Sequence, residues 1–301
     1  MNVSSDLRKM LVDSTLGYQR TMPIFRLKEL SEQEVEARAV TFAEDFFGLY
    51  DDSQFRYNRR PNEGATDLVF HDDTLVRGFH ASGALVAKRA LKWREQPISG
   101  ATDEETLIDA ATQAVDKLGI NKYVGQDEEV RFERLWRIKQ RTVHRNGERD
   151  PVVLRNVVGA FRRYLHGAPV WGRASVYVEL SGDKAVSAAG TDWRLHVEPA
   201  VDEADVIEPE VAVDWVLGEL AARMPGDRLT ERNYVPELFS LGYFSLPKRT
   251  VQLVTQPVYV AKFQARDRAD FSQLIVVRAT YERYGDVDHM LGSPVGSVNR
   301  S

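Results

Sequence analysis

The sequence predicts an α+β protein built from repeated units, each with one helix packed on a curled antiparallel sheet. Three segments carry apolar residues at helical spacing, and each is followed by stretches in which apolar and polar residues alternate. A helix laid across one face of an antiparallel sheet buries the apolar faces of both, so such a unit is physically sensible. The 301 residues, 43% hydrophobic and 28% charged, suffice for several such units.

The expected units follow from where each helix begins. We expect an N-terminal extension over 1–30, a first unit over 31–97, a second over 102–199 and a third over 208–284. A tail over 285–301 is rich in glycine, serine and asparagine and is expected to be loose. The units differ in length, which indicates divergent repeats rather than a tight array.

Two of the helices are predicted to begin at a capping box. Ser31 and Glu34 stand three residues apart, so each side chain can bond a free backbone N–H at the helix start. Thr102 and Glu105 repeat that spacing before the second helix. The third helix is expected to begin at Glu208-Pro209, because proline suits the first helical turn. The expected stops are Gly48, Gly119 and Pro225-Gly226.

Short strands are predicted after each helix, where the apolar period changes toward two. In the second unit, Val130, Phe132 and Trp136 alternate with charged residues, which predicts a strand with one wet face. Trp136, Trp193 and Trp215 stand at apolar positions and are expected in the core. The predicted strands are 67–71 and 84–88 in the first unit, 130–138, 154–165, 173–180, 184–189 and 192–197 in the second, and 250–263 and 273–281 in the third.

One stretch of the second unit, Phe161–Gly190, has a distinctive order of turns and strands. An aromatic strand runs into a Gly-x-Pro-Val-x-Gly turn, and a strand, a glycine-containing hairpin and another strand follow. This stretch resembles the PepSY and FTP propeptide modules of secreted metalloproteases and their stand-alone relatives, with the best match over 102–199. The matching positions are Gly167, Pro169, Val170 and Gly172 in the turn and Gly182-Asp183 in the hairpin.

The resemblance implies a cystatin-like fold, with a helix wrapped by an antiparallel sheet. It also implies a role in binding, inhibiting or chaperoning a peptidase domain. This sequence contains no peptidase domain and no His-Glu-x-x-His motif. A stand-alone binding role is therefore expected in place of a covalent propeptide role.

The sequence lacks the motifs of several kinds of catalytic and metal-binding site. The chain has no cysteine, which excludes a thiol nucleophile, a thiolate zinc site and every disulfide. None of the six histidines has a second histidine at helical spacing, and His71-Asp72-Asp73 is interpreted as a surface turn. Phosphate-loop, dinucleotide and Gly-x-Ser-x-Gly motifs are absent. We therefore expect no cofactor and no metal.

The leading functional hypothesis is a peptide- or protein-binding module. An exposed sheet edge can accept a peptide strand through main-chain hydrogen bonds. Arginines 155, 162, 163 and 173 could line a groove for an anionic or aromatic ligand, or belong to a solvated sheet face paired with acidic residues. The predicted binding residues are Arg162, Tyr164, Gly167, Pro169, Val170, Trp171, Gly172 and Arg173.

Two other functions stay open. One is a cofactor-independent cyclase, isomerase or hydrolase with an acid/base site in a concave sheet face, acting on a small-molecule substrate. Another is an oligomeric scaffold, in which the apolar segment 235–247 forms an interface between copies. That segment could equally form a lid or pack into the core. The acid/base candidates are Tyr164, His166, Glu179, Asp192 and His196.

The net charge of −5 argues against a dedicated nucleic-acid binder. The basic run over 131–145 is interleaved with acidic residues, which favours an ordinary wet strand. No apolar stretch has the length of a signal peptide or of a membrane span, so we expect a cytoplasmic protein without a membrane partner. An exported protein with its leader removed is the alternative.

Overall fold

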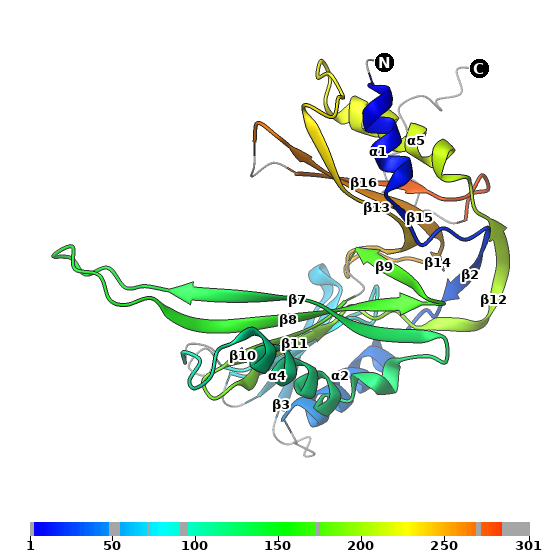
Figure 1. Ribbon diagram of the computed structural model, residues 1–301. Helices are drawn as coiled ribbons and strands as arrows, with labels where there is room; N and C mark the ends of the chain where they lie inside the picture. The colour runs from blue at the N-terminus through cyan, green and yellow to red at the C-terminus, as the bar shows by residue number, and fades with distance from the viewer. Residues whose placement is uncertain are drawn as a thin grey trace.

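In the computed structural model, the chain forms one large sheet, one small sheet and helices that cover their faces (Figure 1). The structure describes residues 3–47, 55–70, 73–90, 96–172, 175–268 and 272–284. Within these ranges are four α-helices, a mixed 13-stranded sheet and an antiparallel three-stranded sheet. The predicted α+β class is confirmed, but most strands of the three expected units pair into one large sheet instead of forming separate curled sheets.

The first expected unit is a helix packed on a four-stranded meander. The capping box is confirmed, because Ser31 N–H donates to the Glu34 carboxylate and Glu34 N–H donates to Ser31 Oγ. The helix packs on the last three strands of the meander. The elements are α2 (Glu32–Phe47), β3 (Phe55–Arg60), the 3₁₀ turn η2 (Pro61–Glu63), β4 (Ala65–Phe70), β5 (Leu75–Phe79) and β6 (Leu85–Lys88).

The second expected unit places its helix across two strands of its meander. The helix is capped by Asp103, whose carboxylate accepts from Thr106 N–H, so the predicted Thr102 cap is one residue early. Aspartate is a preferred N-cap residue, and the second carboxylate oxygen of Asp103 also accepts from the Thr106 hydroxyl. The elements are α4 (Glu104–Lys117), η3 (Ile120–Tyr123), β7 (Glu128–Gln140), β8 (Val153–Leu165), β9 (Ala168–Gly172), β10 (Ser175–Ser181) and β11 (Ala185–Thr191).

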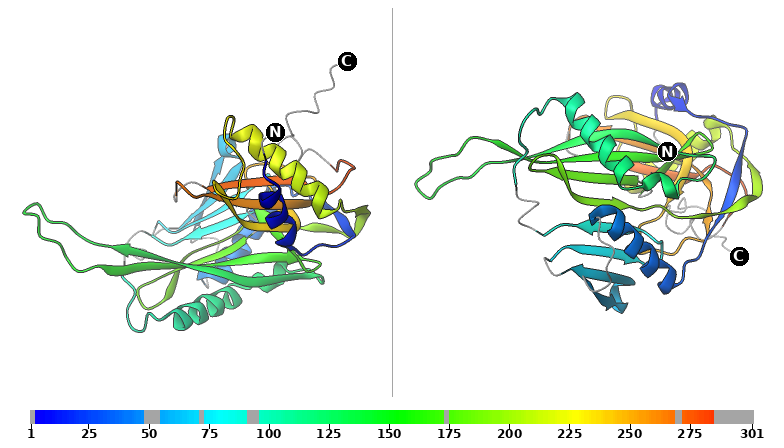
Figure 2. Two further views of the ribbon diagram at one scale, coloured as in Figure 1. Left: turned by 45° about the horizontal axis from the view of Figure 1, so that its top comes forward. Right: turned by 90° about the horizontal axis from the view of Figure 1, so that it is seen from below.

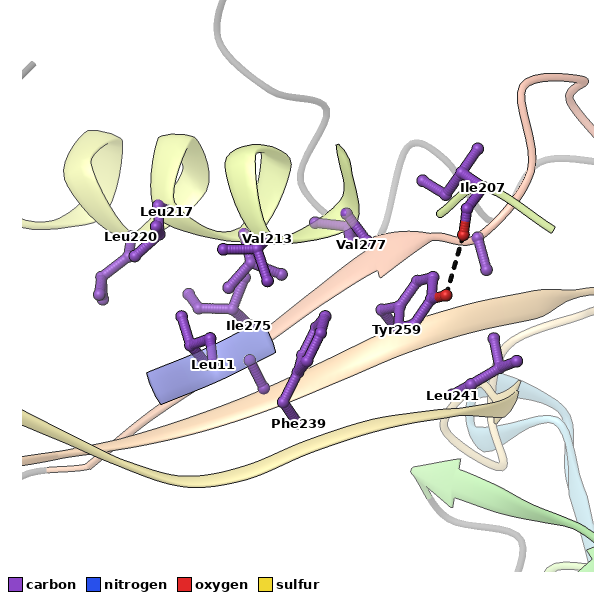
Figure 3. Close-up of a cluster of buried hydrophobic side chains, with 14 of the residues drawn as sticks. Leu11, Ile207, Val213, Leu217, Leu220, Phe239, Leu241, Tyr259, Ile275 and Val277 are labelled. Atoms are coloured by element: carbon purple, nitrogen blue, oxygen red, sulfur yellow. Dashed lines mark hydrogen bonds between the residues drawn. The ribbon is translucent and has the colours of Figure 1, made fainter. Parts of the chain in front are cut away.

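The N-terminal segment packs with the third expected unit. Leu11 of α1 points into the same apolar cluster as Leu217 and Phe239 (Figure 3). Here α1 packs against α5 and β13, while β2 pairs with β12 and β14. The elements are α1 (Ser5–Asp13), β1 (Thr15–Leu16), β2 (Thr21–Leu27), β12 (His196–Asp205), α5 (Pro209–Arg223), β13 (Tyr234–Ser245), β14 (Val254–Thr255), β15 (Pro257–Ala265) and β16 (Ser272–Arg278).

Two strand pairings join the expected units into one molecule. Antiparallel pairing of β11 with β6 links the second unit to the first. Parallel pairing of β9 with β13 links the second unit to the third. β8 pairs with β7 along its whole length. It also pairs with β10 over one part of its length and with β9 near its end, so the large sheet branches at β8. The two views of Figure 2 show β7 and β8 running out of the molecule beyond this branch.

The segment 235–247 is part of the core, not a loop at the surface. Most of it is β13, which is flanked by β15 on one side and by β9 and β1 on the other. Phe239, Leu241 and Tyr243 are fully buried. Of the alternatives for this segment, a lid and an interface between copies are therefore wrong, and core packing is confirmed.

The segment predicted as a strand over 192–197 is different in the structure. Only from His196 does it pair with another strand, and Arg194 instead extends its side chain to bond backbone carbonyls. Trp193 is buried as predicted. The predicted tail over 285–301 and the stop at Gly48 lie outside the described residues.

Candidate functional site

The turn that carries the propeptide-like motif lies within the sheet. His166 and Gly167 have positive φ and form the turn between β8 and β9. Because β9 lies between β8 and β13, residues 168–172 do not form an outer edge of the sheet. Ala168 and Val170 are buried, and Pro169 and Trp171 are half-buried. The predicted binding of a peptide strand at this turn requires an open sheet edge, and these residues do not provide one.

Three arginine–aromatic pairs lie beside this turn. The guanidinium of Arg162 lies 4.2 Å from the ring centroid of Trp171, and that of Arg131 lies 4.1 Å from the ring of Tyr164. Farther along β7, Arg134 lies 4.4 Å from the ring of Trp136. Arg162, Tyr164 and Trp171 were predicted from the sequence, and the structure brings them together. We call the six residues the Arg–aromatic face: Arg131, Arg134, Trp136, Arg162, Tyr164 and Trp171.

The Arg–aromatic face is suited to bind carboxylates and flat apolar groups. A guanidinium stacked on an aromatic ring keeps its in-plane N–H donors available for a carboxylate. Arg131 and Arg134 have side chains 49% and 56% exposed, but each has an acidic neighbour: Arg131 Nε donates to Glu129 at 2.8 Å, and Arg134 lies 3.8 Å from Glu133. A carboxylate ligand would therefore replace these two partners. Arg162 is largely buried and bonds Glu133 and the carbonyl of Val170, so it holds the face together.

A β-bulge explains why Trp136 is exposed rather than in the core. The register with β8 shifts between Phe132 and Arg134, so the residues after the bulge change face. Phe132 therefore packs against the α4 side, whereas Trp136 is 44% exposed on the opposite side. Leu135 takes the inner position, opposite Gly159 of β8. The prediction of Trp136 as a core residue is wrong for this reason.

Arg163 faces away from Arg162, because neighbouring residues of a strand point to opposite faces. Its guanidinium donates to Glu128 and to the carbonyl of Arg194, the latter at 2.8 Å, and lies 4.2 Å from the ring of Trp193. His196 Nδ1 lies 3.0 Å from Glu128 Oε1. The side chains of Glu128, Arg163 and His196 are almost fully buried. The predicted arginine set is thus divided between an open face and a closed ion cluster.

The ion cluster holds His196 in its neutral form. Burial lowers the pKa of His196 to about 4, against the opposing effect of its hydrogen bond with Glu128. Burial alone would raise the pKa of Glu128, but the bond from His196 and the charge of Arg163 outweigh it, so this pKa lies below its usual value. Nδ1 of His196 lies within hydrogen-bond distance of both Glu128 and the Arg163 guanidinium, which can only donate, and Nε2 lies 3.1 Å from the Thr255 hydroxyl. The tautomer therefore decides whether Nδ1–H donates to Glu128 or Nδ1 accepts from Arg163, with Thr255 satisfying Nε2 in either case.

The predicted acid/base residues do not share one site. Glu179 bonds Asn156 and Ser187 within its own sheet. It stands opposite Val158 of β8, six residues before Tyr164, which separates the two by about 20 Å along the strand. Glu179 and Tyr164 therefore cannot act on one small substrate.

The two histidines of that set do approach each other. The rings of His166 and His196 lie 5.2 and 5.0 Å from the ring of Phe25. Asp192 has Arg194 as its electrostatic neighbour. Because His196 is enclosed and neutral, this grouping is a packed junction of β2, β8 and β12. His196 is therefore not accessible as an acid or a base, whereas His166 is 34% exposed and lies 3.9 Å from Asp127.

Some predicted residues fall outside the described part of the chain. These are Arg173, and His71 and Asp72 of the predicted surface turn. Among the described residues, no group of three histidine, aspartate or glutamate side chains could hold a metal ion. Within the same ranges, no helix is long and apolar enough to cross a membrane.

The outer edge of β7 is the feature that sequence reasoning missed. Of the described strands, only β8 pairs with β7, so the other edge of its 13 residues is unpaired. β7 and β8 run out of the molecule together, and we call residues 134–155 the hairpin arm (Figure 1). From Ile138 onward the arm is two-stranded, because β10 pairs with β8 only over residues 157–162. The basic residues of 131–145 signalled an exposed strand, but not that it would project from the molecule.

The comparisons with known proteins show a similarity in fold alone. No family model matches the chain, and no curated protein matches it. Ten solved chains match in structure. One of them is the crystal structure of an uncharacterized protein from Eubacterium rectale, with a TM-score of 0.52 and 10% sequence identity, over 95% of this chain and 100% of that chain. The chain is therefore similar in fold to that bacterial protein.

Proposed function

We propose that the chain is a non-catalytic protein-binding module whose partner lies along β7 and the hairpin arm. The observation that carries the proposal is the unpaired edge of β7. It is 13 residues long, whereas the edge strands β3 and β16 have six and seven residues. An unpaired edge presents backbone N–H and C=O groups to which a strand of a partner can add.

The side chains next to this edge support the same function. Arg131, Arg134 and Trp136 of the Arg–aromatic face lie on β7 itself, so a strand added to β7 would lie against them. Backbone pairing would supply affinity, and these side chains would select the partner. Tryptophan and arginine are also the residues that most often dominate binding energy at protein interfaces.

The resemblance to stand-alone propeptide modules supports a binding role as well. The order of α4 followed by the antiparallel strands β7 to β11 agrees with the cystatin-like arrangement that the resemblance implies. We propose that 102–199 is a module of that class. In this proposal the binding element is the edge of β7 and not the Gly167–Gly172 turn.

Site-specific photocrosslinking tests the proposal. A benzophenone amino acid placed at Ile138 of β7 is expected to crosslink a partner protein in extracts of the source organism. The same group at Tyr57 of β3, an exposed position on a different edge, is the matched control. Amides of residues 129–139 should gain protection from hydrogen exchange when the captured partner binds. Equal crosslinking from both positions, or none from Ile138, would contradict the proposal.

A further inference from the structure

The hairpin arm is strongly basic although the chain as a whole is acidic. Residues 134–155 contain seven lysines and arginines against two acidic residues, a net of +5 in a chain of −5. Lys139, Arg141, Arg145 and Arg149 are exposed, and none forms an ion pair with a described residue. The two acidic residues bond within the arm, Glu148 to Asn146 and Asp150 to His144. The arm therefore carries four cations free to meet an anionic partner.

Apolar side chains are exposed beside these cations. Ile138, Val143, Val152 and Val153 are each at least 40% exposed, in addition to Trp136. Exposed apolar residues that lie together on a projecting element mark an interaction surface, whereas single ones need no explanation. The arm thus offers a surface that is both basic and apolar.

A surface of the opposite charge lies on β12. From Leu195 to Ala222 the chain holds eight carboxylates and no lysine or arginine. Within β12, the exposed carboxylates are Glu198, Asp202, Glu203 and Asp205, and none forms an ion pair with a described residue. Val197 and Val201 of the same strand are 41% and 51% exposed. This strand therefore carries the charge opposite to that of the arm and, like the arm, exposes apolar side chains.

The arm and β12 cannot meet within one molecule. Figure 1 shows the tip of the arm at one end of the molecule and β12 at the other, and the right-hand view of Figure 2 agrees. The arm extends from the large sheet, whereas β12 belongs to the three-stranded sheet at the opposite end of the molecule. Any contact between the two surfaces must therefore join separate copies.

We propose that the hairpin arm of one copy docks on the β12 surface of a second copy. This inference rests on the proposed function and names its partner as another molecule of the same chain. Opposite charges on the two surfaces would steer the copies into register, and the exposed valines and Ile138 would be covered in the contact. Each copy carries both surfaces, so two copies can dock reciprocally or several can join head to tail.

Charge reversal with sedimentation velocity tests the proposal. We expect the wild-type protein to assemble in low salt and to shift toward monomer as salt rises, because screening weakens contacts between exposed charges. Lys139→Glu/Arg141→Glu should weaken assembly by about 100-fold, and Glu198→Lys/Asp205→Lys should do the same. The variant with all four substitutions places opposite charges on the two surfaces again, and its assembly should return.

A matched control removes the effect of net charge. Arg56→Glu/Lys88→Glu changes the charge by the same amount at exposed positions of β3 and β6, and assembly should persist. A wild-type protein that stays monomeric in low salt at its highest soluble concentration overturns the proposal, as does a four-residue variant that remains monomeric. Crosslinking of a different protein from Ile138 by such a monomer would leave the proposed binding function standing and overturn only the identity of the partner.

Discussion

At the scale of single residues, the ion cluster of Glu128, Arg163 and His196 makes stability depend on pH. His196 has a pKa of about 4 in the folded chain, below the value of about 6.5 for an exposed histidine. The unfolded chain therefore binds a proton between these two pH values, while the folded chain does not. Stability is consequently full above about pH 6.5 and falls as the pH is lowered toward 4.

We expect acidification over this range to cost about 3 kcal/mol of unfolding free energy through His196. Denaturant titrations at several pH values would measure it. His196→Gln should flatten the pH dependence above the range in which carboxylates titrate. His144→Gln, at an exposed histidine of the arm, should leave the wild-type slope unchanged. A wild-type protein with constant stability from pH 7 to 4.5 would contradict the assignment of a buried neutral histidine.

Two glycines of the propeptide-like motif provide a second prediction at this scale. Gly167 and Gly172 both have positive φ, which strains any residue with a Cβ. A Cβ on Gly167 would have no other heavy atom within 4 Å, whereas a Cβ on Gly172 would collide with the carbonyl of Ser245 on β13. Gly167→Ala should therefore cost about 1 kcal/mol, from backbone strain alone. Gly172→Ala should cost clearly more, and equal losses in urea unfolding would disprove the close approach of β9 and β13.

At the scale of elements, the packing of α1, a helix that the sequence analysis did not predict, contributes to the stability of the fold. Leu7 and Leu11 are fully buried against α5 and β13, whereas Met10 is 38% exposed. We expect Leu7→Ala to lower the unfolding free energy by about 2–5 kcal/mol, because it removes buried apolar surface and leaves a cavity. Met10→Ala should change it by less than about 1 kcal/mol. Similar losses from both variants would mean that α1 is not docked as described.

The elements that could be predicted are those specified by local chemistry. Ser31 and Glu34 bond each other within one turn, and Pro209 fits the first turn of α5, so both helix starts were found. The bulge at Phe132–Arg134 depends on pairing with β8, which no local pattern reveals, and it moves the predicted core residue Trp136 to the exposed face. For the same reason the edge of β7 could not be predicted, because an edge is defined by the strands that do not pair with it.

At the scale of the whole molecule, Arg194 connects the first and third expected units. Its guanidinium donates to the carbonyl of Ala81 at 3.2 Å and to those of Leu246, Pro247 and Thr250 at 2.8–3.2 Å. Burial lowers its pKa to about 10, so it remains charged at neutral pH. A planar cation with several donors can bond four carbonyls at once, whereas the ammonium of lysine is a compact charge that cannot span them.

Arg194→Lys should therefore leave buried carbonyls without donors and lower the unfolding free energy by about 2–4 kcal/mol. The loss should be felt in both units together, because the same side chain bonds the turn after β5 and the segment after β13. Hydrogen exchange should accordingly quicken at residues 79–84 and at 246–252 in this variant. Arg56→Lys, at an exposed position of β3, should change neither. Faster exchange in only one of the two segments would contradict the role of Arg194 in joining the units. The sheet pairings of β11 with β6 and of β9 with β13 would then hold them together.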